Sequence, residues 1–301
     1  MIRAAVTVAL LGAALWPGRA LAVAETRVPV ERLVPTPGGA GLWVTEDANV
    51  RGHLRLLLDL GWSVAGSQLS LEASEQSASG DRLDVVTQVA AFQLDGAVEL
   101  WRQLRVGLAL PILAPRGDGL EPLGGSSLPS AAVGDLRLHA TVSLWPGSPP
   151  LFQMALASVL YLPTGDADSF AGLGTVGFEP RVLVTLHPLS VLTLRGQVGV
   201  WLHERRQLFG AAWGSRLTWA ACVELGLPWS SLSILLRRLA VLVEADGSTC
   251  AGGCAAPVEL RGGLRLRWAR WHLSVGGGGG VTEAVTAPSW RALGTLGVVL
   301  R

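Results

Sequence analysis

Arginine supplies most of the chemistry that this sequence could perform. All 24 basic residues of the chain are arginines, and a guanidinium stays charged and binds carboxylates through forked hydrogen bonds. The arginines alternate with leucine or valine along most of the chain, so they share the polar face of expected strands. The arginines on that face are Arg51, Arg55, Arg105, Arg137, Arg181, Arg195, Arg216, Arg238, Arg261, Arg265, Arg267 and Arg291. The acids on it are Asp59, Asp135, Glu179, Glu224, Glu244 and Glu259.

The balance of charge on this polar face predicts a positive interior. Arginine outnumbers acid there by about two to one, and charges between low-dielectric walls create a focused field. Some arginines will pair with acids, because an unpaired charge in a confined interior is costly. If the interior conducts, the surplus predicts a preference for anions, with the densest cluster at Arg261, Arg265 and Arg267.

The three cysteines predict one bridge and one packed thiol. Cys250 and Cys254 lie in the turn-rich stretch DGSTCAGGCAAP, and in an exported chain such a pair can form a loop disulfide. The alternative, a metal site, needs more ligands than this pair supplies. Cys222 is left over, and we expect it to be a lumen-facing or packed thiol.

Other residue types give little support for catalysis or for a cofactor. The histidines are spread along the polar faces, whereas a metal cluster needs three or four that converge. Asp166 and Asp168 offer two carboxylates where calcium takes about six to eight oxygens. The glycine run 276–280 lacks the Lys-Ser/Thr of a phosphate loop and indicates close strand packing or a kink. No GxSxG elbow is present, although a Ser/His/Asp triad is recognised by geometry. The sequence therefore predicts no enzyme, no metal and no cofactor.

The stretch from Leu151 to Leu186 shows which elements position these residues. It contains two alternating segments, LFQMALASVLYL and TVGFEPRVLVTL, joined by the turn-rich link PTGDADSFAGLG. Alternation of apolar and polar residues is typical of strands with one apolar face. Arms of about 9–11 residues suit a tilted strand that crosses a bilayer. This stretch therefore predicts a transmembrane β-hairpin.

The same unit recurs along the chain and predicts an all-β fold, an antiparallel transmembrane β-barrel of about twelve strands. The links alternate between long and short, as in outer-membrane barrels with brief periplasmic turns and longer external loops. A soluble β-sandwich, the alternative, does not predict that alternation. The expected strands cover 50–62, 83–100, 104–113, 135–145, 151–162, 175–186, 191–203, 215–227, a segment from about 238, 257–268, 271–281 and 290–300. The second strand changes its apolar parity near Ala90 and Ala91, which predicts a β-bulge.

The beginning of the chain has features of export. Arg3, an apolar run and the small-x-small site Ala20-Leu21-Ala22 predict a signal peptide over 1–22. Residues 23–48 carry several prolines and no sustained period, which predicts an irregular periplasmic segment. Such a segment could also plug the barrel, which covers 49–301.

Several stretches match a known family in their order and spacing. They are VERLVPTPGGAGLWVTEDANVRGHL (30–54), LRVGLALPIL (104–113), GDLRL (134–138) and LPTGDADSFAGLGTVGFEPRV (162–182). They resemble the N-terminal β-barrel of outer membrane protein A-like proteins from myxobacteria and their relatives. The similarity spans nearly the whole mature chain and implies an outer-membrane barrel. That family often carries a C-terminal peptidoglycan-binding domain, which the resemblance does not include, so cell-wall anchoring is not expected.

These observations lead to two expected functions. The first is a narrow porin-like pore for small, preferentially anionic solutes, and the second is a closed barrel with a structural or surface-interaction role. In both cases we expect the outer membrane of a Gram-negative bacterium, with both termini periplasmic. The expected partners are outer-membrane lipid, the barrel-assembly machinery and, for the pore, small anions. The formal net charge of +1 gives no case for nucleic acid.

Overall fold

The computed structural model describes most of the chain. The described residues are 29, 31, 33–37, 43–72, 82–121, 126–145, 151–208, 211–227, 239–250, 256–282, 284 and 287–300. Among them, no helix reaches the length and apolar character of a membrane span.

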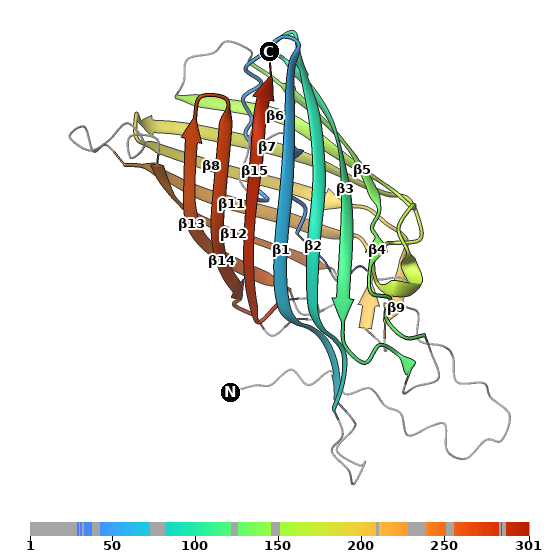
Figure 1. The fold of residues 1–301 in the computed structure, drawn as a ribbon. Coiled ribbons are helices and arrows are strands. Elements are labelled where there is room, and N and C mark those ends of the chain that lie inside the picture. The colour runs from blue at the N-terminus through green and yellow to red at the C-terminus, as the bar shows by residue number, and fades with distance from the viewer. Residues whose placement is uncertain are drawn as a thin grey trace, which may run out of the picture.

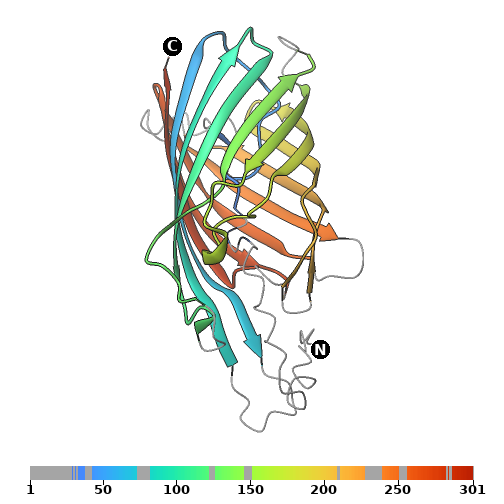
Figure 2. The same ribbon diagram turned by 90° about the vertical axis from the view of Figure 1, so that its right-hand side faces the viewer.

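The protein is a closed antiparallel barrel of 12 strands (Figures 1 and 2). Each strand pairs with its neighbours in the chain, and β1 pairs with β15 to close the barrel. The barrel strands are β1 (Arg55–Glu72), β2 (Arg82–Leu100), β3 (Leu104–Arg116), β5 (Leu136–Ser143), β6 (Phe152–Leu162), β7 (Gly177–Leu189), β8 (Leu192–Trp201), β11 (Arg216–Gly226), β12 (Leu239–Cys250), β13 (Val258–Trp268), β14 (Trp271–Gly280) and β15 (Trp290–Leu300). The additional elements are β4 (Ala132–Val133), the ribbon of β9 (Arg206–Leu208) and β10 (Ala211–Trp213), and the short helix η4 (Ala167–Ser169).

Alternation along the strands creates an apolar outer face and a polar inner face. Leu156 and Val182, which pair across β6 and β7, are 50% and 43% exposed on the outer face. Arg105 on β3 and Glu244 on β12 are buried on the inner face. Because successive side chains of a strand point to opposite faces, the leucine and valine positions form a continuous apolar surface around the barrel.

The two ends of the barrel differ in their connections. Short turns join β2 to β3, β7 to β8 and β13 to β14, and they lie at the end where Leu56 pairs with Leu300. We call this end the turn end, and the opposite one the loop end. Trp101, Arg102 and Ala269 have positive φ angles in these tight turns. Most links alternate between long and short as the sequence predicts, but the turn-end link from Gly226 to Leu239 is longer than the loop-end link from Cys250 to Val258.

The first hairpin departs from the sequence-based expectation in two ways. β1 starts at Arg55 and continues to Glu72, through a Ser/Gly-rich stretch that the sequence indicated as a link. The predicted bulge at Ala90 and Ala91 is wrong, because the pairing of β1 with β2 runs unbroken there and shifts only between Gly66 and Leu71. The apolar parity changes because the inner face itself becomes apolar near the loop end. There Val85, Val89 and Ala91 join a buried cluster with Leu113 and Phe170.

Most of the described residues before β1 lie inside the barrel (Figures 1 and 2), whereas Arg51, His53 and Leu54 are exposed at its turn end. Glu31 contacts Arg291 at the loop-end start of β15, and Gly52 accepts a hydrogen bond from Arg102 at the turn end. The chain therefore passes along the lumen from the loop end to the turn end before it enters β1. It does not form a periplasmic segment outside the barrel in this part, but the plug that the sequence left as the other possibility.

Candidate functional site: the plugged lumen

Residues 43–50 form the part of the chain that fills the middle of the lumen, and we call them the plug. The side chain of Glu244, on β12, binds the main chain of the plug. The Val44 and Thr45 N–H groups donate to the Glu244 carboxylate over 3.1 and 2.6 Å, and the Thr45 hydroxyl donates to it as well. A carboxylate that accepts several backbone N–H groups holds an otherwise unpaired stretch of backbone in a fixed position.

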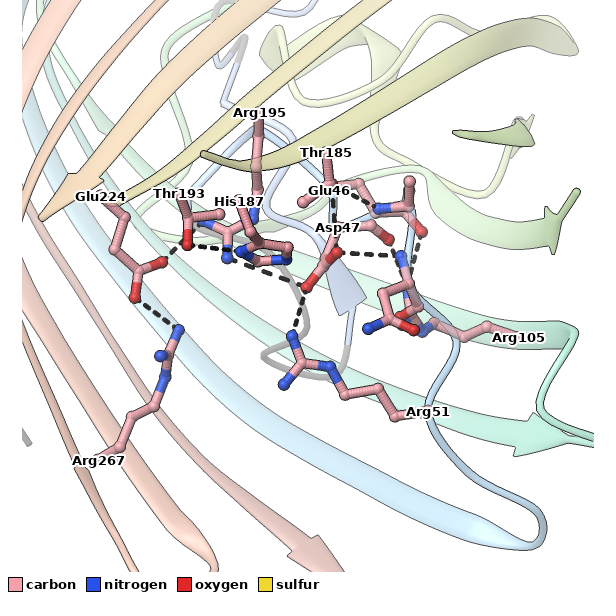
Figure 3. Close-up of polar contacts among 12 residues, drawn as sticks. Glu46, Asp47, Arg51, Arg105, Thr185, His187, Thr193, Arg195, Glu224 and Arg267 are labelled. Carbon is pink, nitrogen blue, oxygen red and sulfur yellow. Dashed lines mark hydrogen bonds and ion pairs between the residues drawn. The ribbon is translucent and has the colours of Figure 1, made fainter. Parts of the chain in front are cut away.

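The two acids of the plug contact the opposite wall (Figure 3). Glu46 accepts from Arg105 over 3.2 Å and from the Thr141 hydroxyl, and its own N–H donates to Gln197. These contacts connect one plug residue to β3, β5 and β8. Because an unpaired buried acid is costly, each of these partners favours the plugged arrangement.

Asp47 lies at the centre of a second set of contacts. Its carboxylate lies 3.1 Å from an Arg51 guanidinium nitrogen and 3.9 Å from one of Arg195, and Thr185 donates to it over 3.2 Å. Asp47 is therefore an anion bound by arginines.

Trp43 fits onto a glycine patch of the wall. Its side chain is buried and lies against Gly263 of β13 and Gly276 of β14, which pair across the two strands. A Cβ atom built on Gly276 would lie 2.3 Å from the Trp43 ring, and one on Gly263 2.5 Å from it. Gly276 opens the run that the sequence indicated as a close-packing site, and the group packed there is the plug tryptophan.

The loop-end part of the segment is held in a similar way. Arg291 of β15 donates to Glu31 over 2.9 Å and to Glu259 over 3.0 Å. Leu33 packs with Trp43, Leu242 and Leu293 in one buried cluster, which also includes Cys222. The segment is therefore anchored at both ends and in the middle.

The structure places most of the sequence-predicted charged residues on the inner face. Buried there are Arg105, Arg137, Arg181, Arg195, Arg216, Arg261, Arg265, Arg291, Asp59, Glu179, Glu224, Glu244 and Glu259. Arg55 is partly buried beside Glu99, at 2.8 Å. Arg51 belongs to the stretch that leads from the plug to β1, and Arg267 lies at the turn-end rim, where it pairs with Glu224 at 2.8 Å. Asp135 lies just before β5 and accepts from Leu173 and Gly165.

Three predicted residues cannot be placed in this way. Arg238 and Cys254 lie outside the described residues, and the side chain of Cys250 does too. The predicted bridge between Cys250 and Cys254 therefore stays a prediction. Cys222 is a buried free thiol, as expected.

Sequence reasoning missed six acids that contribute to the lumen. Asp95 and Glu99 on β2 were missed, although the alternation back from Leu100 places both inside. Asp246 on β12 was missed, although it shares the parity of Glu244. Glu31, Glu46 and Asp47 come from the segment without a period and carry no such signal. With these acids included, the described lumen is close to neutral, so the expected ratio of about two arginines to one acid is wrong for the plugged state.

Among the cavities inside the barrel, two lie on opposite sides of the plug. The larger one, of about 570 Å³, lies at the turn end and is bounded by Asp47, Arg51 and Arg105. A smaller one, of about 80 Å³, is bounded by Val44, Glu31 and the loop-end residues Trp201 and Arg216. The described residues contain no group of three or more His, Cys, Asp or Glu side chains arranged to hold a metal ion.

Comparison with known proteins supports the fold. No family model and no curated protein matches the chain, so the resemblance to myxobacterial outer membrane protein A-like barrels stays a prediction. Among solved structures, the chain is similar to the COG4313 outer membrane channel from Pseudomonas putida F1, with a TM-score of 0.59, 14% identity and coverage of 84% of this chain and 98% of that one. Weaker likenesses include the toluene transporter TbuX from Ralstonia pickettii, with a TM-score of 0.43, 7% identity and coverage of 83% and 90%. Another is LpxR from Salmonella typhimurium, with a TM-score of 0.42, 12% identity and coverage of 80% and 99%. At such identities the likeness shows an outer-membrane type of barrel fold.

Proposed function

We propose that the protein is an outer-membrane channel that its own N-terminal segment closes, and that it passes small solutes when the plug leaves the lumen. The observation that carries this proposal is the set of contacts from Trp43, Glu46 and Asp47 to separate strands. The described contacts between the plug and the wall are non-covalent, so we propose that a released state is populated as well. The apolar outer face and the similarity to a channel protein support the membrane location.

The released state would differ from the plugged state in charge. Departure of the plug removes Glu46 and Asp47 from their positions beside Arg105 and Arg195. Departure of the preceding residues also removes Glu31 from Arg291. The exposed arginines then create a positive field in the open lumen, and we propose a preference for small anions in that state. No catalytic step is part of this function.

Single-channel recording in planar bilayers tests the proposal. The variant Glu46→Gln/Asp47→Asn keeps the shape of the plug and removes both of its charges. We expect it to be open more often than the wild type and to give a reversal potential for anions in a salt gradient. The matched control is Glu121→Gln/Asp118→Asn, which changes the same charges near the end of β3. Cation selectivity in the open state would contradict the proposed preference.

The neutral, filled lumen favours one alternative, a closed barrel with a structural or surface-interaction role. In that case neither the wild type nor the plug variants would conduct, although both would insert and fold. Wild-type conductance with no effect of the plug variants would contradict gating by the plug and leave a pore elsewhere in the lumen.

A further inference from the structure

The cavity at the turn end has the features of a binding site rather than of a simple pore mouth. Its volume of about 570 Å³ is within the usual range for small-molecule pockets. The arginines in its lining are Arg51, Arg55, Arg105, Arg267 and Arg270, and His272 lines it as well. Only two acids, Asp47 and Glu99, share the lining with them. Glu46 and Glu224, which pair with Arg105 and Arg267, lie beside the lining, so five arginines face four acids and the cavity keeps a positive excess of one arginine.

Two of these arginines have free bonding capacity toward the cavity. The Arg51 and Arg267 side chains are 55% and 52% exposed, and each makes its ion pair through one terminal nitrogen. A guanidinium has five N–H donors in a fixed fork, so several donors of each side chain are left for a ligand. The buried Nε atoms of Arg55 and Arg105 also have no hydrogen-bond partner among the described residues.

The position of Asp47 couples this cavity to the plug. Its carboxylate lines the cavity and pairs with Arg51 at 3.1 Å (Figure 3). It thus occupies one of the positions that an incoming oxyanion would take. An anion bound to Arg51 would compete with Asp47 for the same donors and weaken one of the contacts that hold the plug.

We propose that the turn-end cavity binds a small multivalent oxyanion, such as a tricarboxylate or a pyrophosphate, between Arg51 and Arg267, and that this ligand displaces Asp47 and favours release of the plug. This proposal rests on the proposed function, because it identifies the solute of the channel and the ligand that opens it. The binding step itself does not require conduction. Two half-exposed guanidinium groups can bind several charged oxygens at once, so they favour a multivalent anion over a monovalent one.

Isothermal titration of the detergent-solubilised full chain tests the binding step. The probes are citrate and inorganic pyrophosphate, with acetate as the monovalent reference, all at constant ionic strength. We expect both multivalent probes to bind, and Arg51→Gln/Arg267→Gln to bind them at least about tenfold more weakly, because each charge-assisted bond is strong. The control Arg102→Gln/Arg205→Gln removes the same charge from exposed arginines that do not line the cavity, and we expect wild-type affinity.

A second measurement on the protein with the wild-type cavity does not depend on the folding of the arginine variants. The variant is Ala48→Cys, at a buried position of the plug, with the three native cysteines replaced by alanine. Citrate should raise its rate of labelling by a charged maleimide severalfold, and acetate should not. The binding proposal is overturned if neither multivalent probe binds, if acetate binds equally well, or if the double arginine variant retains wild-type affinity. Binding without faster labelling would refute the displacement of the plug. Binding in a protein that never conducts would refute the channel and leave the site in place.

Discussion

Glu244 shows how one side chain can fix a stretch of chain that has no regular structure. It is fully buried and accepts hydrogen bonds from two consecutive backbone N–H groups and one hydroxyl of the plug. Arg261 also lies near it, at 4.0 Å. The plug backbone does not pair with a strand, so this carboxylate replaces part of the hydrogen bonding that a sheet would supply.

Replacement of Glu244 by glutamine should therefore loosen the plug. The change preserves the size of the side chain but removes its charge and one acceptor oxygen, and hydrogen bonds to charged groups contribute about 1.5–3 kcal/mol. We expect the Ala48→Cys site to label about tenfold faster in the Glu244→Gln background. The exposed Glu121→Gln change serves as the control. Equal labelling in both backgrounds would show that Glu244 does not hold the plug.

At the scale of elements, the plug is held by the packing of Trp43 against the paired glycines of β13 and β14. The patch works because two paired glycines leave space on the inner face that any side chain would fill. The wall is therefore complementary in shape to Trp43, a residue of the segment before the barrel that packs on two of the last strands.

Replacement of Trp43 by alanine removes this fit without strain on the wall. Large-to-small changes at a buried aromatic cost about 3–5 kcal/mol, and here the loss falls on the plugged state. We expect a more open channel and faster labelling at position 48, while the barrel keeps its thermal stability. Trp101→Ala, at an exposed turn tryptophan, is the matched control. A fall in barrel stability with no change in labelling would assign Trp43 a purely structural role.

The lipid-facing strands lead to a separate prediction. Val182 lies near the middle of β7 and is 43% exposed on the outer face. An arginine there should cost about 2–4 kcal/mol of folding free energy in lipid, because it lies near the bilayer midplane. Leu189→Arg, at the turn end of the same strand, should cost about 0–1 kcal/mol. Reversible unfolding in vesicles measures both, and equal costs would contradict the assigned depth of these positions.

The sequence predicted these strands well because their signal is local. Leu56, Leu58 and Leu60 alternate with inward residues, and this period of two needs no knowledge of distant parts of the chain. The extension of β1 to Glu72 was missed because the polar composition of that stretch resembles a link, and pairing with β2 overrides it. The contact between Val44 and Glu244 joins residues 200 positions apart. No local pattern encodes such a contact, so the plug could be named only as a possibility.

At the scale of the whole molecule, the plug decides both the charge and the accessibility of the lumen. The strands form a closed barrel whatever the position of the plug, since β1 and β15 pair along eleven residues of each. Residues 43–50 then determine whether the interior is a neutral, filled core or a passage lined by arginines. Opening of the channel therefore depends on whether this segment moves.

A reversible crosslink between plug and wall tests that claim most directly. The Ala48 N–H donates to the Thr185 hydroxyl over 3.1 Å, which places positions 48 and 185 close enough for an engineered disulfide. In planar bilayers, the variant Ala48→Cys/Thr185→Cys, with the native cysteines replaced by alanine, should be silent when oxidised and conduct after reduction. Its open state should favour anions. Equal conductance before and after reduction, with the crosslink verified by mass spectrometry, would contradict closure by the plug.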